Sequence, residues 1–183
     1  MEKTFEKISQ VSKNYADALI AVAKDGKISF EKLTADINTV CEVFETSEDF
    51  RVAMESPAVD GDKKIEIINA IFEGKLSPEV TNFLKILAEK KRICDFMQIR
   101  SAYAEKLNEI NNIQPVTIVS AVELNRDKKN IIVEKLAQKT GKNVQPVWSV
   151  DESIVAGLKI EIDDNVIDMS LKNRIDKLSK NLK

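Results

Sequence analysis

Residues 150–178 read VDESIVAGLKIEIDDNVIDMSLKNRIDKL, and this stretch decides the fold of the C-terminal part of the chain. Its first half, residues 154–162, is rich in side chains that favour β-strands. Residues 163–165 tolerate a positive φ and predict a turn, after which residues 166–167 restart a strand. Ser170 then caps a helix with these apolar residues on one face: Leu171, Ile175, Leu178 and Leu182. The stretch therefore predicts a β-hairpin that runs directly into an amphipathic helix.

The segment before the hairpin alternates strand, helix and strand. Residues 115–122 are rich in β-branched side chains, and residues 144–150 form a second strand. Between them Asn125 caps a helix over residues 126–140, which Gly141 ends. Together with the hairpin and the last helix, these elements predict a small α/β sheet domain.

The first 110 residues instead show helical periodicity with short breaks. Six helices are predicted, roughly over residues 4–24, 30–45, 48–55, 61–73, 78–89 and 93–110. Ser77, Pro78 and Glu79 predict the start of the fifth helix, with a capping hydroxyl, a proline and an acidic residue in order. Connections of four to eight residues favour an antiparallel arrangement. The chain is therefore predicted to be α+β overall: a six-helix antiparallel bundle over residues 1–110, then the small α/β sheet domain over residues 111–183.

The composition limits the classes of function. The formal net charge is −2, which argues against a general binder of nucleic acid or of anionic membranes. The charge is uneven, because residues 1–110 carry 16 basic and 20 acidic side chains and residues 111–183 carry 12 and 10. No apolar run approaches the ~20 residues of a spanning helix, and the N-terminus lacks a signal or transit composition. We expect a protein on the cytosolic side that can dock on a membrane complex.

Residues for catalysis are scarce. Histidine is absent, which excludes Ser-His-Asp triads and His-ligated metals, and Cys41 and Cys94 are expected to be buried free thiols. Thr140-Gly141-Lys142 suggests a phosphate loop, but the earlier glycine of that motif is Leu136 here, so a helix C-cap is favoured. Glu161, Asp163 and Asp164 could hold a cation, but acids at a hairpin turn usually serve the turn itself. We expect no catalytic, cofactor-binding or metal-binding residues.

Apolar residues are more abundant on some elements than a single core contact needs. Helix 1 has a wide apolar arc, and small Ala18 beside Tyr15 would let another helix approach closely. This arc fits either an internal helix with several neighbours or a groove for a partner helix. Trp148 is either a core residue of its strand or a partner contact. The basic terminal helix could dock on a protein or lie on a membrane; it lacks an aromatic anchor and is short, which favours protein.

The chain resembles the delta subunit of F-type ATP synthases, the family of the mitochondrial oligomycin-sensitivity-conferring protein. The C-terminal signature of that family is matched by Asp151, Ser153-Ile154, Ala156-Gly157, Val166-Ile167-Asp168, Ser170 and Leu178. Further matches lie in order along the chain, in residues 15–19, 82–89 and 116–124. The chain departs at Met169, where many members have a small residue, and at Lys91, where a glycine usually precedes Arg92.

The resemblance implies a non-catalytic stator subunit that links the catalytic head to the peripheral stalk, so that the head resists rotor torque during proton-driven ATP synthesis. The helical domain would bind the N-terminal helix of an alpha subunit in a groove between helices 1 and 5, through Tyr15, Ala18, Leu19, Val22, Asn82, Ile86 and Glu89. The sheet domain would bind the b subunits through Trp148, Leu171, Ile175 and Leu178.

The implied location is peripheral, on the cytoplasmic side of a bacterial inner membrane, without membrane insertion, nucleic acid, cofactor or homo-oligomer. Two alternatives stay open from the residues themselves. A small nucleotide-binding enzyme would need a pocket of convergent polar groups, and an RNA-binding adaptor would need exposed stacking aromatics on the sheet.

Overall fold

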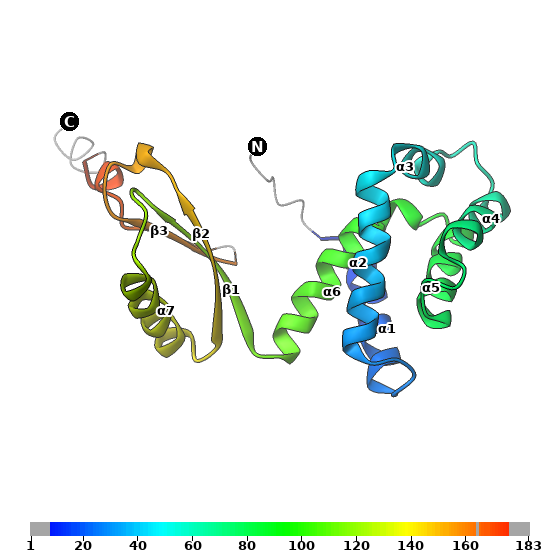
Figure 1. Ribbon diagram of the computed structural model, residues 1–183, viewed down its shortest axis with the longest axis horizontal. Helices are drawn as coiled ribbons and strands as arrows, with labels where there is room; N and C mark the ends of the chain where they lie inside the picture. The colour runs from blue at the N-terminus through cyan, green and yellow to red at the C-terminus, as the bar shows by residue number, and fades with distance from the viewer. Residues whose placement is uncertain (1–7, 164, 176–183) are drawn as a thin grey trace. The chain divides into compact units, whose positions relative to one another are not determined.

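The structure is a computed structural model that describes residues 8–163 and 165–175. The chain forms two compact units, Met1–Leu107 and Asn108–Lys183, and the division falls inside a helix (Figure 1). Each unit has its own hydrophobic core. The predicted α+β class is confirmed, and the antiparallel arrangement of the bundle stays a prediction.

The first unit is helical in the part of it that the structure describes. Its helices are α1 (Gln10–Lys24), α2 (Phe30–Thr46), α3 (Glu48–Glu55), α4 (Gly61–Phe72), α5 (Pro78–Glu89) and α6 (Phe96–Ile110), with a 3₁₀ turn η1 (Ile93–Asp95) before α6. Ser9, Ser29 and Ser47 begin α1, α2 and α3 by accepting a backbone N–H from the first turn of each helix. The large side chains of the core come from all these elements, including Leu33, Met54, Ile68, Phe72, Leu84 and Phe96.

Four details of the helical prediction are wrong. The first helix begins at Gln10 rather than residue 4, because Ser9 is extended and acts as its N-cap. Only Ser47 separates α2 from α3, shorter than the predicted connections, because this residue ends one helix and caps the next. Ile93 lies in η1 and not in α6. Ser77 occupies the N-cap of α5, but its hydroxyl makes no capping hydrogen bond.

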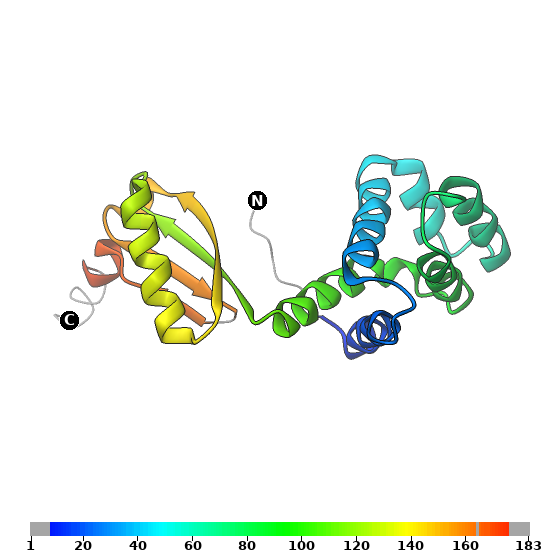
Figure 2. The same cartoon turned by 60° about the horizontal axis from the view of Figure 1, so that its bottom comes forward.

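The second unit is a four-stranded sheet with one long helix on it. The strands are β1 (Ile113–Ser120), β2 (Asn143–Val150), β3 (Leu158–Ile162) and β4 (Asn165–Asp168), in the order β2-β1-β3-β4. The β1 and β2 strands are parallel and are joined through α7 (Arg126–Thr140), whereas β3 is antiparallel to both β1 and β4. Figure 2 shows α7 lying along one face of the sheet.

The register aligns one row of apolar residues across the face that α7 covers. Trp148 pairs with Ile118, Ile118 with Ile160, and Ile160 with Ile167, so all four side chains lie on the same face. Leu136 of α7 packs with Ile118 and Ile160 in the core of this unit. The predicted order of strands and helices is confirmed, and the helix over residues 126–140 has the predicted bounds.

The hairpin prediction needs one correction. Residues 154–157 are not a strand: Ile154 ends a 3₁₀ turn, η2 (Glu152–Ile154), and β3 begins only at Leu158. Val155 and Gly157 both have a positive φ, which breaks an extended chain. The predicted cap at Ser170 is confirmed, because its Oγ accepts the N–H of Asn173 and residues 171–175 are helical. The rest of that helix, including Leu178 and Leu182, lies outside the described residues.

Candidate partner-binding surfaces

Helices α1 and α5 meet through an aromatic contact. The ring of Tyr15 on α1 stands edge-on to the ring of Phe83 on α5, with 6.1 Å between the ring centroids and 76° between the planes. Phe83 is buried in the core, whereas Tyr15 is half-buried and lies at the edge of the core, partly exposed to solvent. The structure therefore brings together the two helices between which the family resemblance implies a groove.

Two stripes of exposed residues flank this aromatic pair. On α1, Val11, Tyr15, Ala18 and Val22 follow helical spacing and are all at least partly exposed. On α5, Asn82, Ile86 and Glu89 follow the same spacing, and Ile86 is 46 % exposed. We call these two stripes together the α1/α5 surface. Leu19 differs from the other predicted residues, because it is only 4 % exposed and belongs to the core beneath them.

A buried carboxylate fixes the start of α5. Asp36 of α2 is almost fully buried, and its carboxylate accepts the backbone N–H of Ser77 at 2.9 Å and pairs with Lys32 at 2.9 Å. Burial raises the pKa of Asp36, but the hydrogen bonds from Ser77 and Lys32 outweigh it and hold the pKa below the ordinary 3.8. The carboxylate of α2 thus holds the backbone of Ser77 at the start of α5, although the Ser77 hydroxyl makes no capping hydrogen bond.

The end of α5 has a conformation that usually requires glycine. The N–H of Arg92 bonds the carbonyl of Leu87 and the N–H of Lys91 bonds that of Ala88, which together make a Schellman motif. Lys91 holds the left-handed position with φ 56°. Lys91, where a glycine was expected from the resemblance, therefore occupies the strained left-handed position of this motif.

The residues predicted for the b subunits occupy two kinds of position. Trp148 lies on the helix-covered face of the sheet, half-buried, with the ammonium of Lys129 5.4 Å from its ring centroid. Leu171 and Ile175 are exposed at the start of the last helix, whereas Leu178 lies outside the described residues. Trp148 is thus mainly a core residue of the second unit, the first of its two sequence interpretations.

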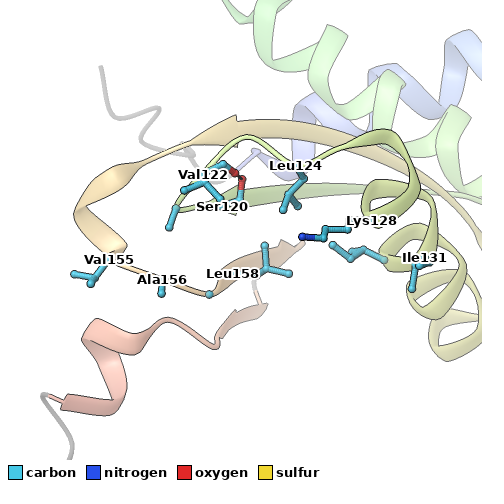
Figure 3. Close-up of a pocket in the computed structure, with 11 residues that line it drawn as sticks. Ser120, Val122, Leu124, Lys128, Ile131, Val155, Ala156 and Leu158 are labelled. Carbon is cyan, nitrogen blue, oxygen red and sulfur yellow. Dashed lines mark hydrogen bonds between the residues drawn. The ribbon is translucent and has the colours of Figure 1, made fainter.

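Sequence reasoning missed a pocket in the second unit. The cavity measures about 420 Å³ between α7, the end of β1 and residues 155–158 (Figure 3). We call it the α7 pocket, and its lining is mostly apolar, from Val122, Leu124, Ile131, Ile132, Val155 and Leu158. Ile131, next to Ile132, was the available signal, because two adjacent isoleucines on a helix cannot both face the sheet.

No reaction centre is visible in the part of the chain that the structure describes. Within residues 8–163 and 165–175 no group of three His, Cys, Asp or Glu side chains could hold a metal. Gly141 is a left-handed C-cap of α7, with φ 68°, and Lys142 precedes β2, so this motif is no phosphate loop. Burial raises the pKa of Cys41, whereas Cys94 is exposed, which corrects the prediction of two buried thiols. Among the described helices, none is long and apolar enough to span a bilayer.

These features are typical of a class of protein: a binding protein of two units, with exposed apolar surfaces on each and no reaction centre among the described residues. The comparisons with known proteins identify the family. The model of the ATP synthase delta (OSCP) subunit family matches residues 11–182, and the chain belongs to this family. This match spans both units.

Two curated relatives support the assignment. ATP synthase subunit delta of Chlorobium chlorochromatii is 33 % identical, over 93 % of this chain and 95 % of the relative. The same subunit of Chlorobium limicola is 33 % identical, over 92 % and 93 %. A chain in the cryo-EM structure of the Toxoplasma gondii mitochondrial ATP synthase hexamer shares the fold, with a TM-score of 0.67 at 22 % identity, over 95 % of this chain and 98 % of that one.

The family is that of a non-catalytic stator component of the ATP synthase peripheral stalk. The two alternative functions, a nucleotide-binding enzyme and an RNA-binding adaptor, have no support among these relatives.

Proposed function

We propose that this subunit joins the N-terminal helix of an alpha subunit, bound on the α1/α5 surface, to the peripheral-stalk b subunits, bound on the second unit. The observation that carries the proposal is the family match over residues 11–182, which includes both units. The chain would thereby reside on the membrane sector as a peripheral protein, on the cytoplasmic side of a bacterial inner membrane.

The task of such a joint is mechanical. Rotor torque would turn the catalytic head unless the head is held to the membrane sector. Holding requires buried area and slow dissociation rather than chemistry. Two binding units in one chain also raise the effective concentration of the second partner once the first is bound.

The α1/α5 surface suits an amphipathic helix. Ala18 leaves room for a close approach, and the half-buried Tyr15 and Val22 and the exposed Ile86 offer apolar contacts. Asn82 and Glu89 lie beside Ile86 on α5 and can pair with polar groups of the bound partner helix. Residues 1–110 carry four more acidic than basic side chains, so a partner helix with basic character fits best.

The test is an Ala18→Asp variant titrated with a peptide of the alpha-subunit N-terminus. The aspartate would be buried without a partner, so we expect a loss of several kcal/mol of binding free energy, about a hundredfold or more in affinity. Ala35→Asp is the matched control, because Ala35 is an exposed alanine on α2. Far-UV circular dichroism must first show that both variants are folded. Parental affinity in folded Ala18→Asp would place the alpha subunit elsewhere.

A further inference from the structure

The α7 pocket has the size and the lining of a small-molecule site. Its volume of about 420 Å³ falls within the range of roughly 300–1,000 Å³ that ligand pockets usually have. Figure 3 shows its walls coming from three parts of the second unit: the end of β1 with the loop after it, α7, and the loop into β3. Most of the lining side chains are aliphatic, so the cavity offers contacts to a hydrocarbon chain.

One cation faces this apolar space. Lys128 lines the pocket, and Figure 3 shows its side-chain nitrogen directed into the cavity, between Leu124 and Leu158. Its backbone is fixed, because the N–H of Lys128 bonds the side chain of Asn125 at the start of α7. Among the residues that the structure describes, no carboxylate lies within 4.0 Å of the ammonium. The ammonium is therefore open to an anionic group that enters the cavity, with which it makes a strong charge-assisted hydrogen bond.

Two other polar groups of the walls are already bonded within the protein. The hydroxyl of Ser120 donates to the carbonyl of Val122 at 2.8 Å, and the carbonyl of Ala156 accepts the N–H of Leu171 at 2.8 Å. A ligand with many polar groups, such as a nucleotide, would leave most of them unpaired against these walls. A ligand with one charged head and an apolar chain pairs its head with Lys128 and buries the rest.

The rim of the pocket holds a residue in a strained backbone conformation. Val155 has φ 66° and ψ −54°, and the N–H of Ala156 bonds the carbonyl of Ile154 at 2.8 Å across it. This is the rarer form of γ-turn, and a β-branched residue is especially unsuited to it. The turn leaves Val155 62 % exposed at the pocket instead of in the core. Strain of this kind gathers at ligand-binding sites.

The charge of the helix beside the pocket favours an anionic head. The α7 helix carries five basic side chains against two acidic ones, Asp127 and Glu134, and neither acid lines the pocket. The positive potential of this helix attracts an anion to the cavity. A cationic head would instead be repelled by Lys128.

We propose that the α7 pocket binds a single-chain amphiphile with an anionic head, of the size of a medium-chain fatty acid. The carboxylate bonds the ammonium of Lys128, and the chain packs among Leu124, Ile132 and Leu158. This inference goes beyond the proposed function, because it assigns a small-molecule ligand to the second unit and does not depend on which subunits the chain joins.

The test titrates the full chain with decanoate by isothermal calorimetry at neutral pH. We expect saturable one-to-one binding with a Kd below about 1 mM. Butyrate has the same head without the long chain, and decyltrimethylammonium has the same chain with a cationic head. Each should bind about tenfold more weakly or worse. A parent chain without saturable decanoate binding would overturn the proposal, and so would equal affinity for the two decyl ligands.

Lys128→Met tests the head-group contact, because it removes the charge and keeps much of the length of an exposed side chain. It should weaken decanoate binding about tenfold and abolish the preference over decyltrimethylammonium. The loss should shrink at high salt, because the contact is partly exposed. Lys135→Met is the matched control: Lys135 lies two turns further along α7, is exposed and does not line the pocket. This variant should bind decanoate within about twofold of the parent.

Ala156→Phe tests the site of the chain, because it adds a phenyl ring to the wall of the cavity at an exposed position. It should weaken decanoate binding about tenfold by taking the space of the chain. Ala35→Phe, at an exposed alanine of α2, is its control and should leave binding unchanged. Far-UV circular dichroism must show that all four variants are folded.

Parental decanoate affinity in folded Lys128→Met and Ala156→Phe would place the bound amphiphile elsewhere and overturn the assignment. Sedimentation velocity adds an independent check on the occupant of the pocket. A dimer of the parent that Ala156→Phe loses, without decanoate binding, would assign the pocket to a second copy of the chain and would also overturn it.

Discussion

Single residues in left-handed conformations decide the local shape of both proposed surfaces. Gly157 has φ 98°, and a Cβ placed on it would lie 2.5 Å from the carbonyl oxygen of Met169. This close approach lets Leu158 and Ala156 bond to Met169 and Leu171, which fixes the start of the last helix beside β3. Lys91 at the end of α5 also has a left-handed backbone conformation, which glycine adopts with less strain than lysine.

Gly157→Ala should destabilise the second unit by about 3 kcal/mol or more, because strain and a backbone clash coincide. Urea unfolding followed by circular dichroism measures the change. Gly141→Ala is the control: Gly141 is also left-handed, but no heavy atom lies within 4 Å of its added Cβ. It should cost about 1 kcal/mol. Equal losses at the two sites would show that the clash is relieved by movement of residues 169–171.

Lys91→Gly should stabilise the first unit by about 1 kcal/mol, since glycine removes the left-handed strain and keeps the Schellman hydrogen bonds. Thermal unfolding of the full chain gives the shift. Lys90→Gly, at the neighbouring position with φ −79°, should instead destabilise. A destabilised Lys91→Gly would mean that the lysine side chain makes a compensating contact.

At the scale of elements, buried side chains from other helices complete what the local sequence leaves unfinished. The start of α5 was predicted correctly at Ser77 and Pro78, yet the side chain that bonds the backbone N–H of Ser77 is Asp36, 41 residues earlier. No local pattern could reveal this, because a lone aspartate within α2 looks like a solvated charge. The carboxylate holds α5, and thereby Asn82 and Ile86, in a fixed position against α2.

Asp36→Ala should cost about 1–3 kcal/mol near neutral pH, because the N–H of Ser77 and the ammonium of Lys32 lose their partner. The pKa of Asp36 is lower in the folded state, so its contribution is complete above the unfolded pKa and is lost as the pH falls through the folded one. The difference between parent and variant should therefore shrink below about pH 4. Asp17→Ala, at an exposed ion pair with Lys106, should change little. A pH-independent difference would argue that packing, not charge, makes Asp36 important.

The elements show how far sequence patterns extend. Periodicity and capping residues predicted the first and last residues of α7 and α3 correctly. Asn125, Gly141 and Ser47 cap these helices through hydrogen bonds to residues within one helical turn, so their effect can be recognised from the local sequence. The prediction of a strand from Ile154 was wrong. The N–H of Ala156 bonds the carbonyl of Ile154 in a γ-turn, and the carbonyls of Ala156 and Leu158 accept the N–H groups of residues 171 and 169. The β-propensity of single residues does not predict such a turn. On the α1/α5 surface, the resemblance pointed to both Ile86 and Leu19, but only Ile86 is exposed and Leu19 is buried in the core. For the α7 pocket, the sequence offered only the adjacent Ile131 and Ile132, because the meeting of the loops around residues 122 and 155 is not recorded in any periodicity.

At the scale of the whole molecule, the chain is two compact units that divide between Leu107 and Asn108, near the predicted change of periodicity at Asn111. Their charges are opposite in sign and their proposed partners differ. Large exposed aliphatic side chains occur in both units and are frequent in the second, among them Val122, Val147, Val166 and Ile167. Such surfaces fit a subunit that works inside an assembly.

We predict that the two units fold separately. A fragment of residues 1–107 should be helical and unfold cooperatively by itself, because its core draws on no residue of the second unit. Circular dichroism during thermal unfolding measures this. Residues 1–110, which keep α6 to its end, form the control fragment and should be at least as stable. Two disordered fragments would show that the units depend on each other.

The positions of the aromatic residues give each unit its own optical signal. Trp148, the only tryptophan, belongs to the second unit and lies beneath Lys129, whereas both tyrosines, Tyr15 and Tyr103, belong to the first. Indole fluorescence therefore reports on the sheet and α7 without interference from the helical unit. The environment of Tyr15, at the edge of Phe83, changes when anything covers α1 and α5. The native chain thus carries an internal probe for each of its two proposed partners, and no label needs to be attached.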